Sequence, residues 1–101
     1  MADTPYFPLE EVKRLLQNPD TRIITRRDRQ AAANLGYADD DEMVARVLQL
    51  TLNDFKKQMP SEDMPGYMLD VYKPTEPDGT KLYIKLQIRE RSGVIVSFKK
   101  K

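Results

Sequence analysis

Apolar and polar residues alternate through residues 81–101, on both sides of a turn signal. The first half places apolar side chains at every second position: Leu82, Ile84, Leu86 and Ile88. After the Arg-Ser-Gly sequence at 91–93, the alternation resumes with Val94, Val96 and Phe98. A period of two is typical of a half-buried strand, and glycine readily takes the positive φ angle of a tight turn. The pattern predicts a β-hairpin that turns at Gly93.

Placing both apolar sets on one core fixes the predicted register of this hairpin. The predicted pairs are Ile88 with Val94, Gln87 with Ile95, Leu86 with Val96, Lys85 with Ser97, Ile84 with Phe98 and Tyr83 with Lys99. Directly opposed side chains of an antiparallel pair lie about 5 Å apart. One face is therefore apolar, and the other brings the Tyr83 phenol close to Lys85 and Lys99. We expect this second face to be the working surface.

Apolar residues at helical spacing predict three helices in the first half of the chain. The first begins after Pro8 and ends at the Asn-Pro-Asp sequence of residues 18–20. The second has Thr25 as its N-cap, with Asp28 as a capping-box-like partner. The third follows the acidic residues 39–41, which suit the positive end of a helix. The core-facing residues of the first and third helices are Leu9, Val12, Leu15, Leu16, Met43, Val44, Val47 and Leu48.

A further short helix is predicted over residues 52–59. Thr51 is a good N-cap for it, with Asp54 at the third helical position. The residues expected to face the core are Leu52, Phe55 and Met59. Lys56 and Lys57 project away from that face.

The remaining extended segments complete the predicted fold. Residues 22–24 form a short strand or extended piece, and residues 67–73 alternate as a strand. Together with the hairpin, the strand at 67–73 gives a three-stranded antiparallel meander. We therefore predict a single α+β domain, residues 1–101, with N-terminal helices packed on one face of a small C-terminal antiparallel β-sheet.

The composition narrows the possible chemistry. The chain has no Cys and no His, which excludes disulfides, thiolate sites, thiol nucleophiles and every histidine-based mechanism or metal site. Any acid–base chemistry must use Lys, Tyr, Asp, Glu or water. No apolar run approaches the ~18 residues of a membrane-spanning helix, and residues 1–5 lack the pattern of a signal peptide. We expect a cytoplasmic protein without membrane contact.

The net charge of +1 hides an asymmetry. Residues 81–101 hold seven Lys or Arg and one acidic residue, whereas residues 1–80 hold ten Lys or Arg and fifteen acidic residues. A basic hairpin on an otherwise acidic chain indicates an anionic partner at one face. A solvated tail at residues 99–101 explains part of the same charge without a partner, and both interpretations stay open.

Other charged clusters also admit more than one interpretation. Arg26, Arg27 and Arg29 could contact RNA phosphate or pair with nearby acids. The acids at 39–41 could hold a metal, but N-caps use the same residue types, and the spacing of a calcium loop is absent. Residues 25–50 have the length of a helix-turn-helix DNA-binding module, although their acidic segment would repel phosphate.

Cleaving RNA without histidine makes three demands. The ribose 2′-OH must lose its proton, the phosphorane must be stabilised, and the leaving 5′-oxygen must gain a proton. Lysine ammonium groups can meet the second demand, and a Lys or Tyr with a perturbed pKa can share the other two. Tyr83 beside Lys99 suits this chemistry, and a phenol can also stack on a base. Exposed Tyr–Lys pairs also occur in sheets without activity, so the geometry alone leaves both interpretations open.

Five segments of the chain resemble those of MqsR toxins in order and spacing. They lie at residues 4–13, 53–59 (NDFKKQM), 70–74 (DVYKP), 82–85 (LYIK) and 94–99 (VIVSFK). The resemblance implies a type II toxin–antitoxin toxin with a RelE-like α+β fold. Such toxins are bacterial mRNA interferases, and MqsR is a sequence-specific endoribonuclease that acts at GCU-type sites without a metal or other cofactor.

The resemblance also implies a mechanism and partners. Attack by the 2′-OH would leave a 2′,3′-cyclic phosphate and a 5′-OH end, and loss of mRNA would inhibit translation and growth. The implied partners are mRNA and an MqsA-like antitoxin, whose zinc-binding domain holds the toxin. Contact with operator DNA would be made only indirectly, through the antitoxin.

The catalytic residues of the family are carried over by motif. The lysine of F-x-K-x-M falls on Lys57, the tyrosine of the following strand on Tyr83, and the lysine after V-S-F on Lys99. The family glutamine before D-V-Y falls on Leu69, which has no hydrogen-bonding group, so its task must be dispensable or pass to another group such as Asp70 or a water. This departure leaves an alternative, a weak or inactive member that binds RNA or its antitoxin without cleavage.

Further lysines are expected to bind RNA beside this catalytic group. They are Lys56, Lys73 and Lys85. Ordinary solvation explains each of them equally well, so their role stays open.

Overall fold

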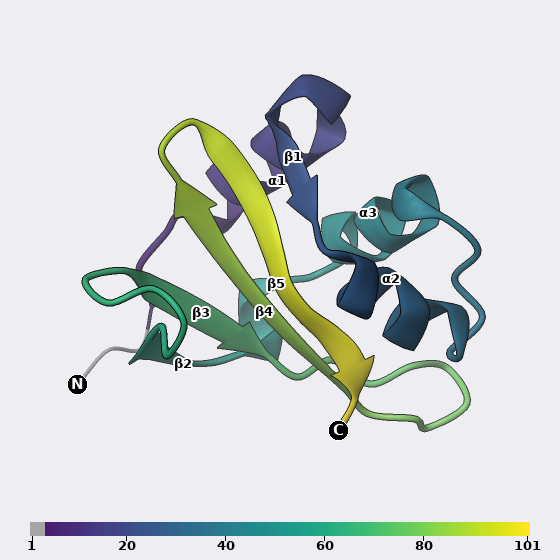
Figure 1. The fold of residues 1–101 in the computed structure, drawn as a ribbon. Coiled ribbons are helices and arrows are strands. Elements are labelled where there is room, and N and C mark those ends of the chain that lie inside the picture. The colour runs from purple at the N-terminus through teal and green to yellow at the C-terminus, as the bar shows by residue number, and fades with distance from the viewer. Residues whose placement is uncertain (1–3) are drawn as a thin grey trace.

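Within residues 4–101, the part of the chain that the computed structural model describes, the strands form one five-stranded sheet in the order β1-β5-β4-β3-β2 (Figure 1). The strands are β1 (Arg22–Ile24), β2 (Phe55–Pro60), β3 (Met68–Tyr72), β4 (Leu82–Arg89) and β5 (Ser92–Lys100). The helices are α1 (Leu9–Gln17), α2 (Arg26–Ala33) and α3 (Asp40–Leu48), with short 3-10 helices η1 (Pro19–Thr21) and η2 (Leu52–Asp54). Residues 1–3, part of the segment without a signal-peptide pattern, lie outside the described residues.

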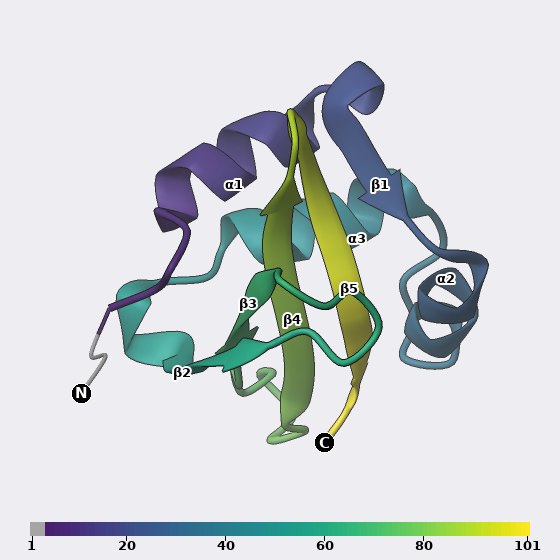
Figure 2. The same ribbon diagram turned by 60° about the vertical axis from the view of Figure 1, so that its left-hand side comes forward.

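Helices α1 and α3 cover one face of the sheet, while α2 lies beside β5 and the loop between β2 and β3 crosses the other face (Figure 2). The buried helix residues include Leu9, Val12, Leu16, Met43, Val44 and Val47. They pack with sheet residues that include Tyr72, Leu82, Ile84, Leu86, Ile95 and Phe98. Full burial of one such apolar side chain stabilises the fold by roughly 1.5–3 kcal/mol. This layer therefore supports the polar face of β4 and β5 from behind.

The structure confirms the predicted fold class, because the helices are N-terminal and the sheet is mainly C-terminal. The predicted helix starts are also present. The backbone N–H of Asp28 donates to the Thr25 hydroxyl at 3.3 Å, and that of Glu42 donates to the Asp39 carboxylate at 2.9 Å. Asp39 thus caps α3, as expected if the acids at 39–41 serve the start of this helix.

The sheet is larger than the predicted meander and is mixed. β1 pairs in parallel with β5, placing Ile23 opposite Val94, and β2 pairs antiparallel with β3 at the other edge. A strand as short as β1 carries no periodic signal, and its pairing with β5 joins segments far apart in the sequence. Such non-local pairing depends on tertiary packing, and local patterns do not encode it.

The helix predicted over residues 52–59 is wrong, because η2 is a single turn and β2 follows directly. The predicted cap is present, since the Thr51 N–H donates to the Asp54 carboxylate at 2.9 Å. Packing overrides any continuation of the helix. The Phe55 ring meets Tyr72 edge-on at 5.6 Å between centroids, and pairing with β3 satisfies the backbone polar groups of the segment.

The residues expected on this helix therefore lie in other surroundings. Leu52, expected in the core, is 62% exposed. Phe55 packs against the core as expected, and Met59 is half-buried on β2. Lys56 and Lys57 lie on an edge strand instead of a helix surface.

Half of the predicted hairpin register is confirmed. The observed pairs that match are Tyr83 with Lys99, Ile84 with Phe98 and Lys85 with Ser97. A β-bulge beyond Lys85 inserts Val96 into β5, so the later pairs differ from the prediction by one residue: Leu86 with Ile95, Gln87 with Val94 and Ile88 with Gly93. The half of the hairpin that carries the candidate site is therefore correctly predicted.

The tight turn of the hairpin is formed by Glu90 and Arg91, so its predicted position at Gly93 is wrong. Glu90 supplies the positive φ angle, 58°. Gly93 lies within β5, where an added Cβ atom would come 3.1 Å from side-chain atoms of both Leu15 and Leu16. Glycine suits this position because α1 approaches the strand closely.

Candidate active site

The ring of Tyr83 is surrounded by lysine ammonium groups. The Nζ atoms of Lys73, Lys85 and Lys99 lie 5.6, 5.3 and 5.6 Å from the ring centroid. Tyr83 and Lys85 belong to β4, Lys99 belongs to β5, and Lys73 follows β3 directly. These distances fall within the range of cation–π attraction. The arrangement gathers positive charge around one half-buried phenol.

Lys57 shares the face of the sheet that carries Tyr83. It lies opposite Val71 on β3, Val71 lies opposite Lys85, and Lys85 lies opposite Ser97. Directly opposed residues point to the same side of a sheet, so these side chains form one row across four strands. Lys57 stands two strands from Lys85, a backbone separation of about 10 Å. It is exposed, and it approaches the site from a strand and not from the predicted helix.

The structure brings some of the predicted site residues together and leaves others apart. Tyr83, Lys73, Lys85 and Lys99 form a cluster, and Lys57 flanks it on the same face. Lys56 occupies the β-bulge between Phe55 and Lys57, where it is exposed and has no partner in the strand register. The structure does not bring Lys56 into the cluster.

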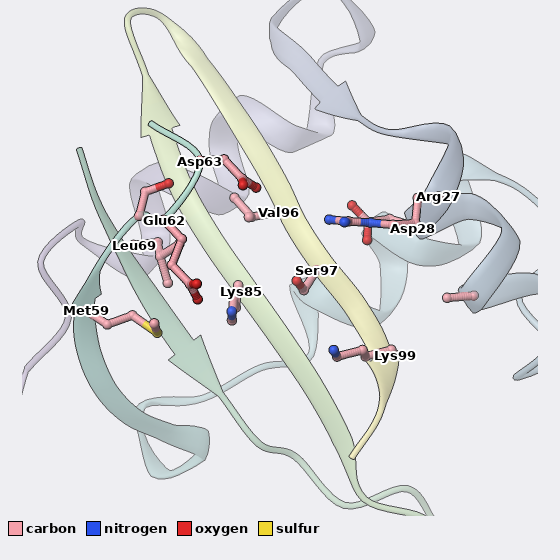
Figure 3. Close-up of a pocket in the computed structure, with 12 residues that line it drawn as sticks. Arg27, Asp28, Met59, Glu62, Asp63, Leu69, Lys85, Val96, Ser97 and Lys99 are labelled. Atoms are coloured by element: carbon pink, nitrogen blue, oxygen red, sulfur yellow. The ribbon is translucent and has the colours of Figure 1, made fainter. Parts of the chain in front are cut away.

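A cavity of about 330 Å³ adjoins the lysine cluster, between α2 and the β2–β3 loop (Figure 3). Its floor includes Leu69, Lys85, Ser97 and Lys99. Helix α2 contributes Arg27 and Asp28, and the loop contributes Glu62 and Asp63. Lys85 and Lys99 belong both to the cavity and to the cluster around Tyr83.

Leu69, which the resemblance of motifs matches with a glutamine, is 2% exposed and lies opposite Met59. The register places Gln87 beside it on β4, yet that amide is already engaged. The Gln87 Nε2 atom donates to the carbonyl of Met68 at 3.1 Å, and the Oε1 atom accepts from Arg89 at 2.8 Å. This part of the cavity floor is therefore apolar.

Asp70 does not replace the missing glutamine. Its carboxylate accepts hydrogen bonds from the backbone N–H groups of Tyr6 and Phe7 at 2.8 and 2.9 Å. Burial raises the pKa of the Asp70 carboxyl, and these two hydrogen bonds lower it. Asp70 fastens the N-terminal segment to β3, and successive strand residues point to opposite faces, so it faces away from the Leu69 side.

Asp28 is the buried carboxylate of the cavity, with an exposed fraction of 4%. The Thr25 hydroxyl donates to its Oδ2 atom at 2.7 Å. Burial raises the pKa of the Asp28 carboxyl, while the Thr25 hydrogen bond, Arg27, the Phe98 backbone and Lys99 act in the opposite direction. The sequence identifies Asp28 as a helix-cap partner, but nothing local indicates that α2 would bring it to the lysines.

The arginines of α2 lie in different surroundings. Arg29 makes a two-point contact with Asp40, at 2.6 and 2.9 Å, so it pairs with an acid. Arg27 lines the cavity and stands close enough to Asp28 to lower the pKa of that carboxyl. It is the arginine of this group that adds positive charge to the cavity.

Across residues 4–101, no helix is both long enough and apolar enough to span a membrane. Among the same residues, no three acidic side chains stand together in a way that could hold a metal ion.

Comparison with known proteins places the chain in a family. A family model described as the motility quorum-sensing regulator, toxin of MqsA, matches residues 4–100. No curated protein matches the chain significantly. The family match covers nearly the whole chain, including every strand that carries the lysine cluster. The chain therefore belongs to the MqsR family, the toxins that pair with MqsA antitoxins.

Proposed function

We propose that this toxin is an mRNA endoribonuclease that cuts GCU-type sites by attack of the ribose 2′-OH, without a metal. The observation that carries the proposal is the set of ammonium groups around Tyr83, each with its Nζ atom within 5.6 Å of the ring centroid. Family membership supports the toxin role. Cleavage of mRNA in the cytoplasm would explain how such a protein inhibits translation and growth.

RNA binding rests on the positive charge of the open sheet face. Lys73, Lys85 and Lys99 converge on Tyr83, and Lys57 extends the charge toward the edge strand. Phosphates attract such lysines regardless of sequence, and a tyrosine ring offers a stacking surface to an unpaired base. The strands fix the backbone positions from which these side chains extend.

The same groups suit the chemical step. As the 2′-oxygen attacks phosphorus, the phosphorane gains negative charge, which the ammonium groups of Lys85 and Lys99 stabilise. The Tyr83 hydroxyl protonates the leaving 5′-oxygen, and the charge that develops on the phenol is stabilised by the same lysines. Lys57 binds a neighbouring phosphate and orients the strand. The products are a 2′,3′-cyclic phosphate and a 5′-OH end.

The proposed partner in regulation is an MqsA-like antitoxin. The family description names MqsA as the partner of these toxins. Binding of the antitoxin would keep the toxin inactive, and any contact with operator DNA would be made by the antitoxin.

A second candidate function is binding of RNA or antitoxin without cleavage. The apolar Leu69 favours it, because a lost donor to the transition state costs about 10²–10³ in rate when that donor is critical. The retained group of Lys57, Tyr83 and Lys99 favours cleavage.

A substituted RNA separates the two candidates. Purified toxin, free of antitoxin, is incubated with a 5′-labelled RNA containing one GCU site and with the same RNA carrying 2′-deoxyribose at the scissile position. The proposal expects cleavage of the first RNA to a cyclic phosphate and no cleavage of the second. Equal binding of both RNAs without cleavage of either would favour the binding-only protein.

A further inference from the structure

A buried carboxylate stands beside the lysines of the proposed ribonuclease site. We propose that Asp28 is a further catalytic residue, whose carboxylate accepts the proton of the attacking 2′-hydroxyl. The inference rests on the proposed ribonuclease function. In that function the lysines stabilise charge and Tyr83 donates a proton, so a separate group must accept the proton of the 2′-hydroxyl.

The geometry places Asp28 in the cavity next to the phosphate-binding groups. Asp28 lies at the α2 side of this cavity, where α2 meets β5, and Ser97, Lys99 and Lys85 lie along its floor (Figure 3). The hydrogen bond from the Thr25 hydroxyl to Oδ2, at 2.7 Å, fixes the orientation of the carboxylate. A proton acceptor needs this kind of preset position, within reach of a bound hydroxyl.

The Asp28 carboxylate has a structural role, because the Thr25 hydroxyl and the Phe98 backbone both hydrogen-bond to it, but that role does not require an ionised group. Burial of an ionised group is costly unless it is well paired, and no ion pair holds Asp28 among the salt bridges of the described residues. A negative charge beside Lys99 also weakens the attraction for RNA phosphate. Capping of α2 needs only the Thr25 oxygen, which already accepts the backbone N–H of Asp28 at 3.3 Å.

The surroundings tune the carboxyl toward proton transfer. Burial raises the pKa of the Asp28 carboxyl, which makes the carboxylate a stronger base. The charged groups that face it are Arg27 from its own helix and Lys99 from β5, and both lower the pKa. Glu62 and Asp63 line the same cavity from the opposite loop. The net effect of these groups and of burial is a raised pKa for the Asp28 carboxyl.

The proposed step balances in atoms and charge. The O–H bond of the 2′-hydroxyl breaks and its proton passes to Asp28, while the 2′-oxygen forms a bond to phosphorus. The bond from phosphorus to the 5′-oxygen then breaks, and that oxygen takes the proton of the Tyr83 hydroxyl. Asp28 releases its proton to water and Tyr83 regains one from water, which restores the starting state.

The test compares Asp28→Asn with Thr25→Val in the full-length toxin. Asparagine keeps the size of the side chain and can still accept from Thr25, but it cannot accept a proton. Valine removes the hydroxyl and its cap but keeps the carboxylate. Asp20→Asn makes the same chemical change at an exposed position on η1 and serves as the control. Cleavage of the GCU RNA is followed across pH 4–9, and circular dichroism checks the fold of each variant.

We expect Asp28→Asn to lower kcat by about 10²–10⁴-fold, the usual contribution of a general base, and to lose the rise in rate with pH on the acid side. Thr25→Val should keep that rise but shift it to higher pH, because the lost hydrogen bond had lowered the pKa of Asp28. Asp20→Asn should match the unsubstituted toxin.

Two results would overturn the inference in distinguishable ways. If the unsubstituted toxin cleaves and Asp28→Asn cleaves at a similar rate with the same pH profile, Asp28 is not the base, although the ribonuclease function stands. If the unsubstituted toxin does not cleave RNA, the proposed function fails, and the role of Asp28 fails with it.

Discussion

Tyr83 and Lys99 face each other across β4 and β5, and the Lys99 Nζ atom lies 5.6 Å from the centre of the tyrosine ring. The pair occupies the part of the hairpin before the β-bulge, where the register follows the simple alternation of the sequence. Because Ile84 and Phe98 of the same two strands are buried against the helices, the pair is displayed on a rigid support.

The first prediction concerns this pair. Tyr83→Phe removes only the hydroxyl and Lys99→Ala only the ammonium arm, so each should lower cleavage by at least about 10² while the circular dichroism spectrum stays unchanged. Growth inhibition in cells should disappear with both. Lys81→Ala, at an exposed position just before β4, is the matched control for loss of one lysine. Full toxicity of both site variants would exclude the pair from catalysis.

The second prediction concerns metal dependence. If the lysine ammonium groups neutralise the phosphorane, cleavage should proceed at the same rate in excess EDTA as in magnesium-containing buffer. The rate is measured on RNA without stable secondary structure, so that magnesium does not act by folding the substrate. A rate that EDTA abolishes and magnesium restores would contradict the lysine-based account.

The third prediction concerns the apolar cavity floor at Leu69. Leu69→Gln places an amide at the position that the resemblance of motifs matches with a catalytic glutamine, and we expect it to raise the cleavage rate up to about 10²–10³-fold if that amide donates to the transition state. Leu69→Met conserves volume and apolar character, so it should leave the rate unchanged. Equal rates for the Gln and Met variants would mean that the amide is dispensable in this protein.

The fourth prediction concerns stability and pH. Burial raises the pKa of the Asp28 carboxyl in the folded state above its value in the unfolded chain. The protonated carboxyl therefore contributes to the stability of the fold, and this contribution is fully present below the unfolded-state pKa of Asp28. That contribution is lost as the pH rises through the raised folded-state pKa. Asp28→Asn should therefore unfold at a urea concentration equal to or above that of the unsubstituted protein at pH 7. Its advantage should shrink at pH 4. A large loss of stability at pH 7 would show that the charge itself holds the fold.

The fifth prediction concerns Gly93. An added Cβ atom would lie 3.1 Å from side-chain atoms of Leu15 and Leu16 and 3.2 Å from the Val12 carbonyl oxygen, in the tightly packed contact between α1 and β5. Gly93→Ala should lower the free energy of unfolding by about 1–3 kcal/mol, as overpacking does. Ser92→Ala, its half-buried neighbour, should change it little. An unchanged urea midpoint for Gly93→Ala would mean that α1 can shift away at no cost.

Local sequence patterns predict the placement of those site residues that lie close together in the chain. The alternation around Tyr83 and Lys99 placed both side chains on one face, because a hairpin pairs residues across a short turn. Beyond Lys85 the predicted register is wrong, because the extra residue Val96 does not disturb the alternation of apolar and polar residues. Bulges of this kind depend on how the strand packs in the folded protein, which the alternation does not encode.

Contacts between segments far apart in the chain could not be predicted from the sequence. The segment that contains Lys57 has a helix cap before it, and only its pairing with β3 makes it a strand. Asp28 was identified as a cap partner, but its place beside Lys99 follows from the packing of α2 against β5. In both cases tertiary contacts decided between local alternatives.

Mapping RNA ends gives the most direct test of the central claim that the lysine cluster around Tyr83 cleaves mRNA. Purified toxin, free of antitoxin, and its Lys99→Ala variant are each incubated with a long natural mRNA, and the new 5′ ends are located by primer extension. The account predicts discrete cuts at GCU-type sites with the toxin and none with the folded variant. Absence of cuts with a folded toxin that still binds its antitoxin, or identical cuts with the variant, would contradict it.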